Sequence, residues 1–323
     1  MIRKWGIRLF DSAPAFGVHF GNFFYFLAIF SLFFGTAALL FLCRRFGKAF
    51  AKKLLLIILW ANFALHFLKQ FLPAYIAKWP WGLADSAFPN LCAVLIFIAP
   101  FIFMFGNVYL KDYLFYIGSI SALLVYFVPT GAMRYETYPL GFADPEYFAE
   151  TMRFYICHFP LVACSLIMVD QGFHTLDYHR LWAVPIMFCA ILTLVALNAF
   201  FFGPILKLQN YPHDIFGPDG LLNRFSEHQE VANQSMAFGP QPNVDKALSW
   251  AYPFMIPGLQ YFYVDGERIF TPVIWLLPYL YFGTALLGPL LALPFEHRHM
   301  ALDWNALLQW RKMRKEERIA RLK

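Results

Sequence analysis

The sequence predicts an all-α, polytopic membrane protein built as a seven-transmembrane-helix bundle, and two observations lead to this class. Hydrophobic residues make up 60% of the 323 residues, charged residues make up only 14%, and the mean hydropathy is +0.52. Soluble domains carry about 25% charged residues, so a chain this poor in charge cannot coat a water-facing globule of its size. The apolar residues also fall into separate runs, each close to the length of about 20 residues that spans a bilayer as a helix.

Seven apolar runs are candidates for membrane crossings. In chain order they occupy residues 22–43, 54–72, 88–109, 113–128, 154–169, 181–202 and 271–293. Lys111 and Asp112 form the expected turn between the third and the fourth run, and an acidic loop that includes Glu150 precedes the fifth. The predicted organisation is an interfacial segment at 1–21, a transmembrane domain at 22–293 with a long external loop at 203–270, and a basic cytoplasmic tail at 294–323.

The placement of Lys and Arg gives the expected orientation. The link between the first two runs holds five basic residues and no acidic ones, namely Arg44, Arg45, Lys48, Lys52 and Lys53. Residues 310–323 hold seven basic residues against Glu316 and Glu317. Seven crossings put both segments on one side, which the positive-inside rule makes cytoplasmic, although Arg3, Lys4 and Arg8 oppose an outside N-terminus. We therefore expect N-out, C-in. The tail is either a solvated topology anchor or a binding site for anionic lipid headgroups.

Polar side chains from four of the runs fall at one level of the outer leaflet under this topology. They are Cys92, His158, His66, Lys69 and Asn198, which lie within about two turns of one another at a rise of about 1.5 Å per residue. Ionisable residues at membrane depth are costly and tend to mark function. A thiol and an imidazole at one depth are also the groups that thioester-forming acyl transfer requires.

Each of these residues also has an ordinary structural explanation. Cys92, like the other four cysteines, fits the role of a small core residue. His158 fits a hydrogen-bonding residue between helices, and Asn198 fits the same role. Lys69 can extend its ammonium group to the outer interface. The case for a functional site therefore depends on the conjunction of the residues.

Known catalytic and cofactor motifs are missing from the sequence. There is no CxxC pair, GxSxG elbow, HxxxxD signature, P-loop or Gly-rich nucleotide fingerprint. The spacing of His174, Asp177, His179 and Arg180 resembles a metal cluster only loosely. We therefore expect no cofactor, no metal site and no nucleic-acid partner.

Three segments of the chain carry a family resemblance. They read FPNLCAVLIFIAPFIFMFGN at 88–107, YLFYIGSISALLVYFVPTG at 113–131 and FYICHFPLVACSLIMVDQGF at 154–173, and a helix ending LNAFF follows. Over roughly residues 50–205 the chain is similar to the YwaF-like integral membrane family. That family is mostly bacterial and is related to a vertebrate seven-helix acyltransferase that makes ether-linked phospholipids. The resemblance implies a multi-pass protein of a bacterial plasma membrane that acts in lipid metabolism.

The resemblance implies a catalytic cysteine at Cys92 and a catalytic histidine at His158. The family often has a histidine two positions before its cysteine, where this chain has Asn90. The expected function is a membrane acyltransferase or phospholipid transacylase that holds the acyl chain as a thioester and passes it to a lysophospholipid-type acceptor. Asn90 or Asn198 is expected to hydrogen-bond the oxyanion, and Lys69 or His66 to hold the headgroup phosphate.

Two other classes stay open at this point. Seven helices with an outward-facing polar pocket also describe a small-solute membrane transporter or sensor, and several of the runs carry Pro or Gly as broken transporter helices do. A non-catalytic scaffold is the third possibility. A cysteine within reach of a histidine favours the enzyme, whereas solute flux that survives thiol modification favours the transporter.

Overall fold

The computed structural model describes residues 16–76, 88, 90–133, 140–208, 235–240, 245–264 and 266–321, and it is mostly helical. Among these residues, four helical stretches are long and apolar enough to cross a membrane: Phe23–Phe71, Val108–Phe127, Pro145–Asp170 and Ile274–Arg314. Two shorter apolar helices accompany them, Leu91–Phe105 and Ala183–Asn198. The helical class is confirmed, and the long apolar helices suggest the multi-pass membrane protein expected from composition.

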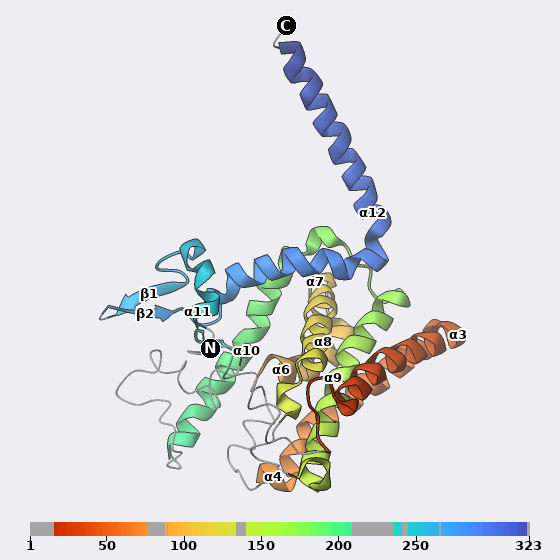
Figure 1. Ribbon diagram of the computed structural model, residues 1–323, viewed down its shortest axis with the longest axis vertical. Coiled ribbons are helices and arrows are strands. Elements are labelled where there is room, and N and C mark those ends of the chain that lie inside the picture. Colours follow the sequence, from red (N-terminus) through yellow and green to blue (C-terminus); the bar gives the residue numbers. More distant parts are fainter. Residues whose placement is uncertain are drawn as a thin grey trace.

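The first two predicted crossings form one bent helix, α3 (Phe23–Leu68). It begins at Asn22, whose side chain accepts a hydrogen bond from the Tyr25 N–H at 2.9 Å. Gly47 breaks the helical geometry with φ 83° and ψ 179°, a conformation open essentially to glycine alone. The prediction of a non-helical basic link between two helices was therefore wrong. The basic residues from Arg44 to Lys53 are helical on both sides of a bend at Gly47. The second half returns along α9 towards η1 (Lys69–Phe71) and α4 (Pro73–Ile76) (Figure 1).

The third and fourth predicted crossings meet earlier in the chain than expected. Helix α6 (Leu91–Phe105) ends at Gly106, and α7 (Val108–Tyr113) continues through a π-helical turn, η2 (Leu114–Gly118), into α8 (Ser119–Phe127). Asn107 caps α7 by accepting a hydrogen bond from the Leu110 N–H at 3.0 Å. Lys111 and Asp112 thus lie inside a helix, and the prediction of a turn there was wrong.

Helix α9 (Pro145–Asp170) starts well before the predicted fifth crossing. The Asp144 side chain accepts hydrogen bonds from the Glu146 and Tyr147 N–H groups, and Pro145 occupies the first helical position, where a missing N–H costs nothing. This start places Glu150 in a helix rather than in the expected loop. Short 3-10 turns precede and follow α9, at Thr130–Ala132 (η3), Gly141–Ala143 (η4) and Tyr178–Arg180 (η5).

The predicted external loop at 203–270 contains regular structure. Helix α10 (Ala183–Leu208) extends into it. Further along are α11 (Asp245–Leu248), η6 (Ser249–Phe254) and an antiparallel hairpin of β1 (Tyr261–Val264) and β2 (Glu267–Phe270) that pairs Tyr261 with Phe270. Phe238, Met255 and Trp275 are buried in a second apolar core with residues of α6 and α10. The described residues from 235 onward therefore pack onto the bundle, while residues 209–234 and 241–244 of the predicted loop lie outside the described residues.

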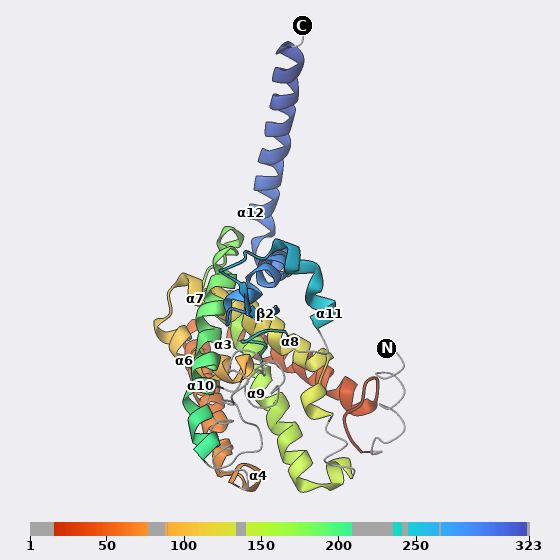
Figure 2. The same cartoon turned by 90° about the vertical axis from the view of Figure 1, so that its left-hand side faces the viewer.

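Helix α12 (Leu277–Arg321) follows η7 (Ile274–Leu276) and contains Pro289 and Pro294. Its first part lies across one end of the bundle, and its C-terminal part extends away from it (Figures 1 and 2). At this end, basic residues near the Gly47 bend of α3 contact the end of α9 and the link between α9 and α10. Arg44 pairs with Asp170, and Lys48 Nζ donates to the Gly172 carbonyl at 2.9 Å. The structure thus places the basic residues near Gly47 and the start of the basic tail at the same end.

The N-terminal residues that the structure describes contact the opposite end of α9. The Val18 N–H donates to the Tyr147 hydroxyl at 3.1 Å, and the Val18 side chain is fully buried. Residues 1–15 of the predicted interfacial segment lie outside the described residues.

Candidate functional site

Cys92 lies in the first turn of α6, among side chains that cap this helix. The Asn90 side-chain oxygen accepts a hydrogen bond from the Ala93 N–H at 3.0 Å. The Phe88 N–H donates to Asn198 Oδ1 of α10 at 3.3 Å. The structure therefore brings Asn90 and Asn198 to the helix end that carries Cys92. The side-chain oxygen of each accepts a hydrogen bond from a backbone N–H group. Their Nδ2 groups are the donors through which they would bind an oxyanion.

The Cys92 side chain is partly buried where α6 meets α7 and α10. It lies close enough to the Tyr113 phenol of α7 to interact with it electrostatically, and Cys189 of α10 is a second neighbour of that phenol. The Leu91 N–H donates to Ser235 Oγ at 2.8 Å, so the segment that begins at 235 also covers this helix end. The thiol is enclosed by protein and is not freely exposed to water.

His158 is a buried residue of α9, and its two ring nitrogens are distinct. Nδ1 lies 2.6 Å from the Phe154 carbonyl oxygen, one turn earlier in the helix. A carbonyl oxygen only accepts hydrogen bonds, so Nδ1 carries the proton. Nε2 of the neutral ring then holds the lone pair, which is the state that a general base requires.

Helices α6 and α9 pack against each other, which brings the helices of Cys92 and His158 together. Within the described residues, no hydrogen bond joins the Cys92 thiol to the His158 ring. Catalytic hydrogen bonds are often long in the absence of substrate and tighten when it binds. The structure thus places the two predicted catalytic side chains on adjacent helices without joining them directly.

Lys69 lies in a buried polar cluster between η1, α4 and α9. Arg153 donates to both carboxylate oxygens of Glu150, from Nε at 3.1 Å and from Nη2 at 2.7 Å, and its Nη2 also donates to the Tyr75 hydroxyl at 3.1 Å. The Tyr75 hydroxyl in turn donates to Glu150 Oε2 at 3.1 Å. Lys69 Nζ lies 5.4 Å from the centre of the Tyr75 ring, and Cys157 neighbours both cations. Lys69 is buried and does not extend to the surface as the alternative explanation required.

Arg153, Glu150 and Tyr75 were not among the sequence-predicted site residues. The signal was present in the spacing of Glu150 and Arg153, three residues apart, which pairs them on one helix face. It was missed because the helix was expected to start only near 154. With Lys69, the cluster brings two cations and a carboxylate together between η1, α4 and α9.

His66 is fully buried one turn before Lys69, on the α3 face that meets α9. One turn earlier, Asn62 Nδ2 donates to the Cys157 carbonyl at 2.9 Å. This bond joins α3 to α9 directly before His158. Asn62, His66 and Lys69 therefore form a polar row along the inner side of the second half of α3.

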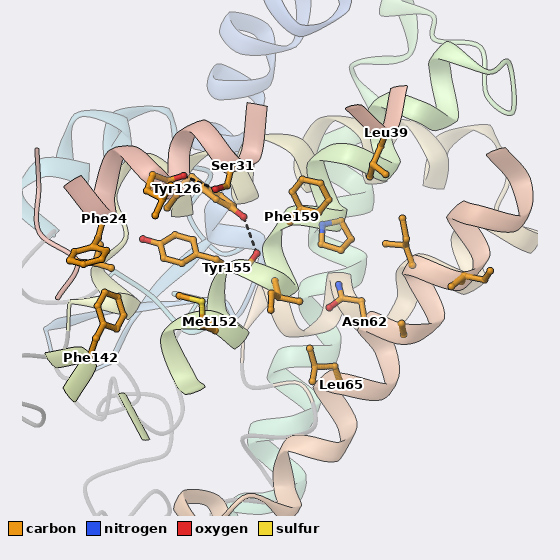
Figure 3. A pocket seen from close by; sticks show the side chains of 18 residues that line it. Phe24, Ser31, Leu39, Asn62, Leu65, Tyr126, Phe142, Met152, Tyr155 and Phe159 are labelled. Carbon is orange, nitrogen blue, oxygen red and sulfur yellow. Dashed lines mark hydrogen bonds between the residues drawn. The ribbon is translucent and has the colours of Figure 1, made fainter. Parts of the chain in front are cut away.

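A large apolar cavity lies between α3 and α9, and Asn62 is one of its lining residues. It has a volume of about 630 Å³ and is bounded by both halves of α3 and by α9, with Tyr126 of α8. Figure 3 shows Phe24 and Leu39 from the first half of α3 facing Met152, Tyr155 and Phe159 of α9.

The amides and hydroxyls that line this cavity are few. Asn62 and Ser31 contribute polar atoms, and Ser31 Oγ already donates to the Leu27 carbonyl at 2.7 Å. The Tyr126 hydroxyl donates to the Tyr155 carbonyl at 2.9 Å (Figure 3). A cavity of this size and lining fits an extended hydrocarbon group better than a hydrated solute.

A second polar cluster occupies the opposite end of the bundle, and it includes Asp112. His174 Nε2 lies 2.7 Å from Asp112 Oδ1, and Arg180 Nε donates to Asp112 Oδ2 at 2.7 Å. The hydrogen bond to Asp112 raises the pKa of Arg180. Asp112 is fully buried, and these two partners compensate its charge inside the helix.

The same cluster joins α12 to the link before α10. Tyr178 donates to Asp303, and this hydrogen bond raises the pKa of Tyr178 to about 12. Burial opposes ionisation of Asp177, but hydrogen bonds from His179 and the charge of Arg180 outweigh it and lower the pKa of Asp177. Within the described residues, no group of three or more His, Cys, Asp and Glu side chains is arranged to hold a metal ion.

Comparison with known proteins gives no relative for this chain. No family model, curated protein or solved structure matches it.

Proposed function

We propose that this chain is a membrane acyltransferase or phospholipid transacylase, with Cys92 as the nucleophile and His158 as the base. The observation that carries this proposal is the apolar cavity of about 630 Å³ beside α9, the helix that presents His158. A hydrocarbon chain bound there would extend along the same helix as the histidine. An acyl group delivered from the bilayer requires no soluble donor, which agrees with a sequence that has no nucleotide or coenzyme motif.

The proposed reaction has two halves that share one base. In the first, the Cys92 proton passes to His158 Nε2, the thiolate attacks the ester carbonyl of a phospholipid, a C–S bond forms and the C–O bond breaks. The leaving lysophospholipid oxygen takes the proton from His158. In the second, an acceptor hydroxyl of a lysophospholipid gives its proton to His158, its oxygen forms a new C–O bond with the thioester carbonyl, the C–S bond breaks, and the Cys92 sulfur takes the proton back from His158.

Other polar residues have supporting roles in this proposal. The Asn90 and Asn198 amides lie at the helix end that carries Cys92 and are candidates for the oxyanion donors, and Asn198 is also the candidate for a third catalytic group. Lys69 and His66 are candidates for contacts to the headgroup phosphate, and Arg153 adds a partly buried cation near Lys69.

The proposed topology has seven crossings, with the N-terminus outside and the C-terminus inside, in a bacterial plasma membrane. It would divide α3 into two crossings at Gly47. The four long apolar helices and two shorter ones support the multi-pass part of this proposal. The common location of the basic α3 residues and the basic tail supports the same-side part.

A small-solute transporter or sensor, or a non-catalytic scaffold, is the alternative class. A solute pocket requires polar groups that replace water around its ligand. The cavity beside α9 offers mainly carbon atoms and few groups that could replace water around a solute. These features favour a lipid over a hydrated solute as the ligand.

The test is transfer of a labelled acyl chain to the protein. Purified protein in lipid nanodiscs is incubated with phospholipid that carries a radiolabelled acyl chain, and hydroxylamine-sensitive label on the protein is measured. We expect label on the wild type and on Cys189→Ala, a matched control because Cys189 is also partly buried and neighbours the same tyrosine. We expect none on Cys92→Ala, and slowed labelling of His158→Ala. Equal labelling of Cys92→Ala, or no label on any variant, overturns the proposal.

A further inference from the structure

Beyond the bundle, α12 continues as a helix with all its described side chains exposed. Every described side chain from Ala301 to Arg314 is exposed, and this part of the helix extends away from the other helices (Figures 1 and 2). Large apolar groups are among them, with Leu302 66%, Trp304 58% and Trp310 50% exposed. Most helical stability in proteins comes from burial of an apolar face. This segment buries no such face if it stays in water. The segment therefore requires a surface to lie on.

The charge of this segment indicates the chemistry of that surface. Residues 310–323 hold seven basic residues and two acidic ones. Arg314 lies with its guanidinium 5.4 Å from the Trp310 ring, so cation and aromatic ring occupy one patch of the helix. The basic residues of α3 lie at the same end of the bundle, as the Arg44–Asp170 and Asp303–Tyr178 contacts establish. One end of the molecule thus presents cations from two helices.

We propose that residues 301–323 bind the surface of a bilayer that contains anionic lipids. Trp304 and Trp310 lie in the headgroup layer, as aromatic residues of interfacial helices do, and the Arg and Lys side chains pair with lipid phosphates. The segment continues directly from the apolar part of α12, so it begins close to the membrane surface. This inference is independent of any acyl transfer, because it uses no residue of the candidate site.

A second copy of the same segment is a less suitable partner. Two such helices side by side would bring together an excess of positive charge from each, which opposes their association. An anionic bilayer carries the complementary charge and also accepts the tryptophan rings. Each Lys or Arg near such a surface increases binding by about fivefold, so removal of two charges has a measurable effect.

The experiment measures protection of the tail from trypsin in the full-length protein. The protein is placed in nanodiscs of neutral phosphatidylcholine, with or without phosphatidylglycerol, and cleavage after Arg318 and Arg321 is followed over time. We expect cleavage to be about tenfold slower with the anionic lipid, and high salt to remove the difference. Arg311→Gln/Lys312→Gln, which keeps both measured cleavage sites, is expected to reduce the difference to less than about twofold.

The matched control is Lys52→Gln/Lys53→Gln, which also removes two adjacent exposed cations from the same end of the molecule. This variant is expected to keep the full lipid-dependent protection. Equal cleavage rates in the two lipids overturn the proposal. Loss of protection in the control variant would mean that the total charge of this end, and not the tail, causes the protection. That result also overturns the proposal. Protection that depends on two copies per nanodisc, and not on lipid charge, identifies a second chain as the partner instead.

Discussion

The largely buried pair of Glu150 and Arg153 offers a direct test of how α9 is held against its neighbours. The two side chains are 11% and 16% exposed, and two hydrogen bonds join them at 2.7 and 3.1 Å. Lys69 adds a second buried cation to the same cluster. Glu150→Gln keeps the size of the side chain but removes the carboxylate that pairs with Arg153, so the Arg153 guanidinium loses its opposite charge.

The expected loss follows from the energetics of buried ion pairs. Removal of one partner from such a pair destabilises a protein by about 3–5 kcal/mol, because the other charge is left buried and unpaired. A glutamine still accepts one hydrogen bond from Arg153, and such a bond to a charged group contributes about 1.5–3 kcal/mol. We therefore expect Glu150→Gln to lower the free energy of unfolding by about 3 kcal/mol, at the lower end of the range.

Removal of both charges is expected to cost less than removal of one. Replacing a buried pair by apolar side chains of similar volume is often close to neutral. In Glu150→Gln/Arg153→Met no unpaired charge from this pair is left, so the double variant should regain most of the stability that Glu150→Gln loses. The non-additivity of the two changes measures the interaction between the groups.

The assay is unfolding of the purified protein by dodecyl sulfate in mixed micelles, followed by the change in helical circular dichroism. Glu146→Gln is the matched control, because Glu146 lies in the first turn of the same helix and is exposed. We expect this control to differ from the wild type by less than about 0.5 kcal/mol. The reasoning is refuted if Glu150→Gln is as stable as Glu146→Gln, or if the double variant is less stable than Glu150→Gln.

Three further predictions use the same unfolding assay. Gly47→Ala is expected to lower the free energy of unfolding by about 1–3 kcal/mol, because the backbone conformation at this position is strained for any residue with a Cβ. No atom lies within 4 Å of the added Cβ, so the loss would come from the backbone alone. Unchanged stability would mean that α3 does not bend there. Gly288→Ala places a Cβ 2.7 Å from Leu181 Cδ2 and is expected to lower the free energy of unfolding by about 1–3 kcal/mol. Adding Leu181→Ala to this variant should recover part of that loss. If the losses of the two substitutions simply add, the contact is contradicted. Because the pKa of Asp177 is lowered below its ordinary 3.8 in the folded state, its carboxylate stabilises the fold above that value, and the contribution disappears as the pH falls through the lowered pKa. The stability difference between the wild type and Asp177→Asn should thus be present at about pH 5 and vanish below the lowered pKa, and a difference that persists far below that pKa would contradict this sign.

Features that depend on composition and on local sequence could be predicted. Long apolar runs specify helices wherever they occur, because only a helix satisfies its own backbone hydrogen bonds away from water. Helix ends were predicted less well, although their signals are also local. Asp144 followed by Pro145 is a strong helix start, but it precedes a charged stretch that was interpreted as a loop.

Features that depend on distant partners could not be predicted. Asp112 was assigned to a turn because a carboxylate inside an apolar run is costly, and the partners that compensate it lie 62 and 68 residues further along the chain. Lys69 presents the same difficulty, because its burial depends on residues from α4 and α9. Depth along a helix follows from the rise per residue, but the direction of a side chain around the axis depends on which helices are neighbours.

That distinction also explains how the candidate site is organised. Cys92 and His158 were selected for their common depth, and the structure adds that α6 and α9 are neighbours and that the His158 proton lies on Nδ1. The Asn62–Cys157 hydrogen bond joins α3 to α9; Asn62 lines the apolar cavity, and Lys69 and Arg153 lie further along the same two helical segments. A bound lipid needs both environments, an apolar one for its chain and a cationic one for its phosphate. Helix α9 and the second half of α3 contribute residues to both environments. The presence of polar and apolar surfaces on these two helices is therefore the physical basis on which a lipid substrate is proposed.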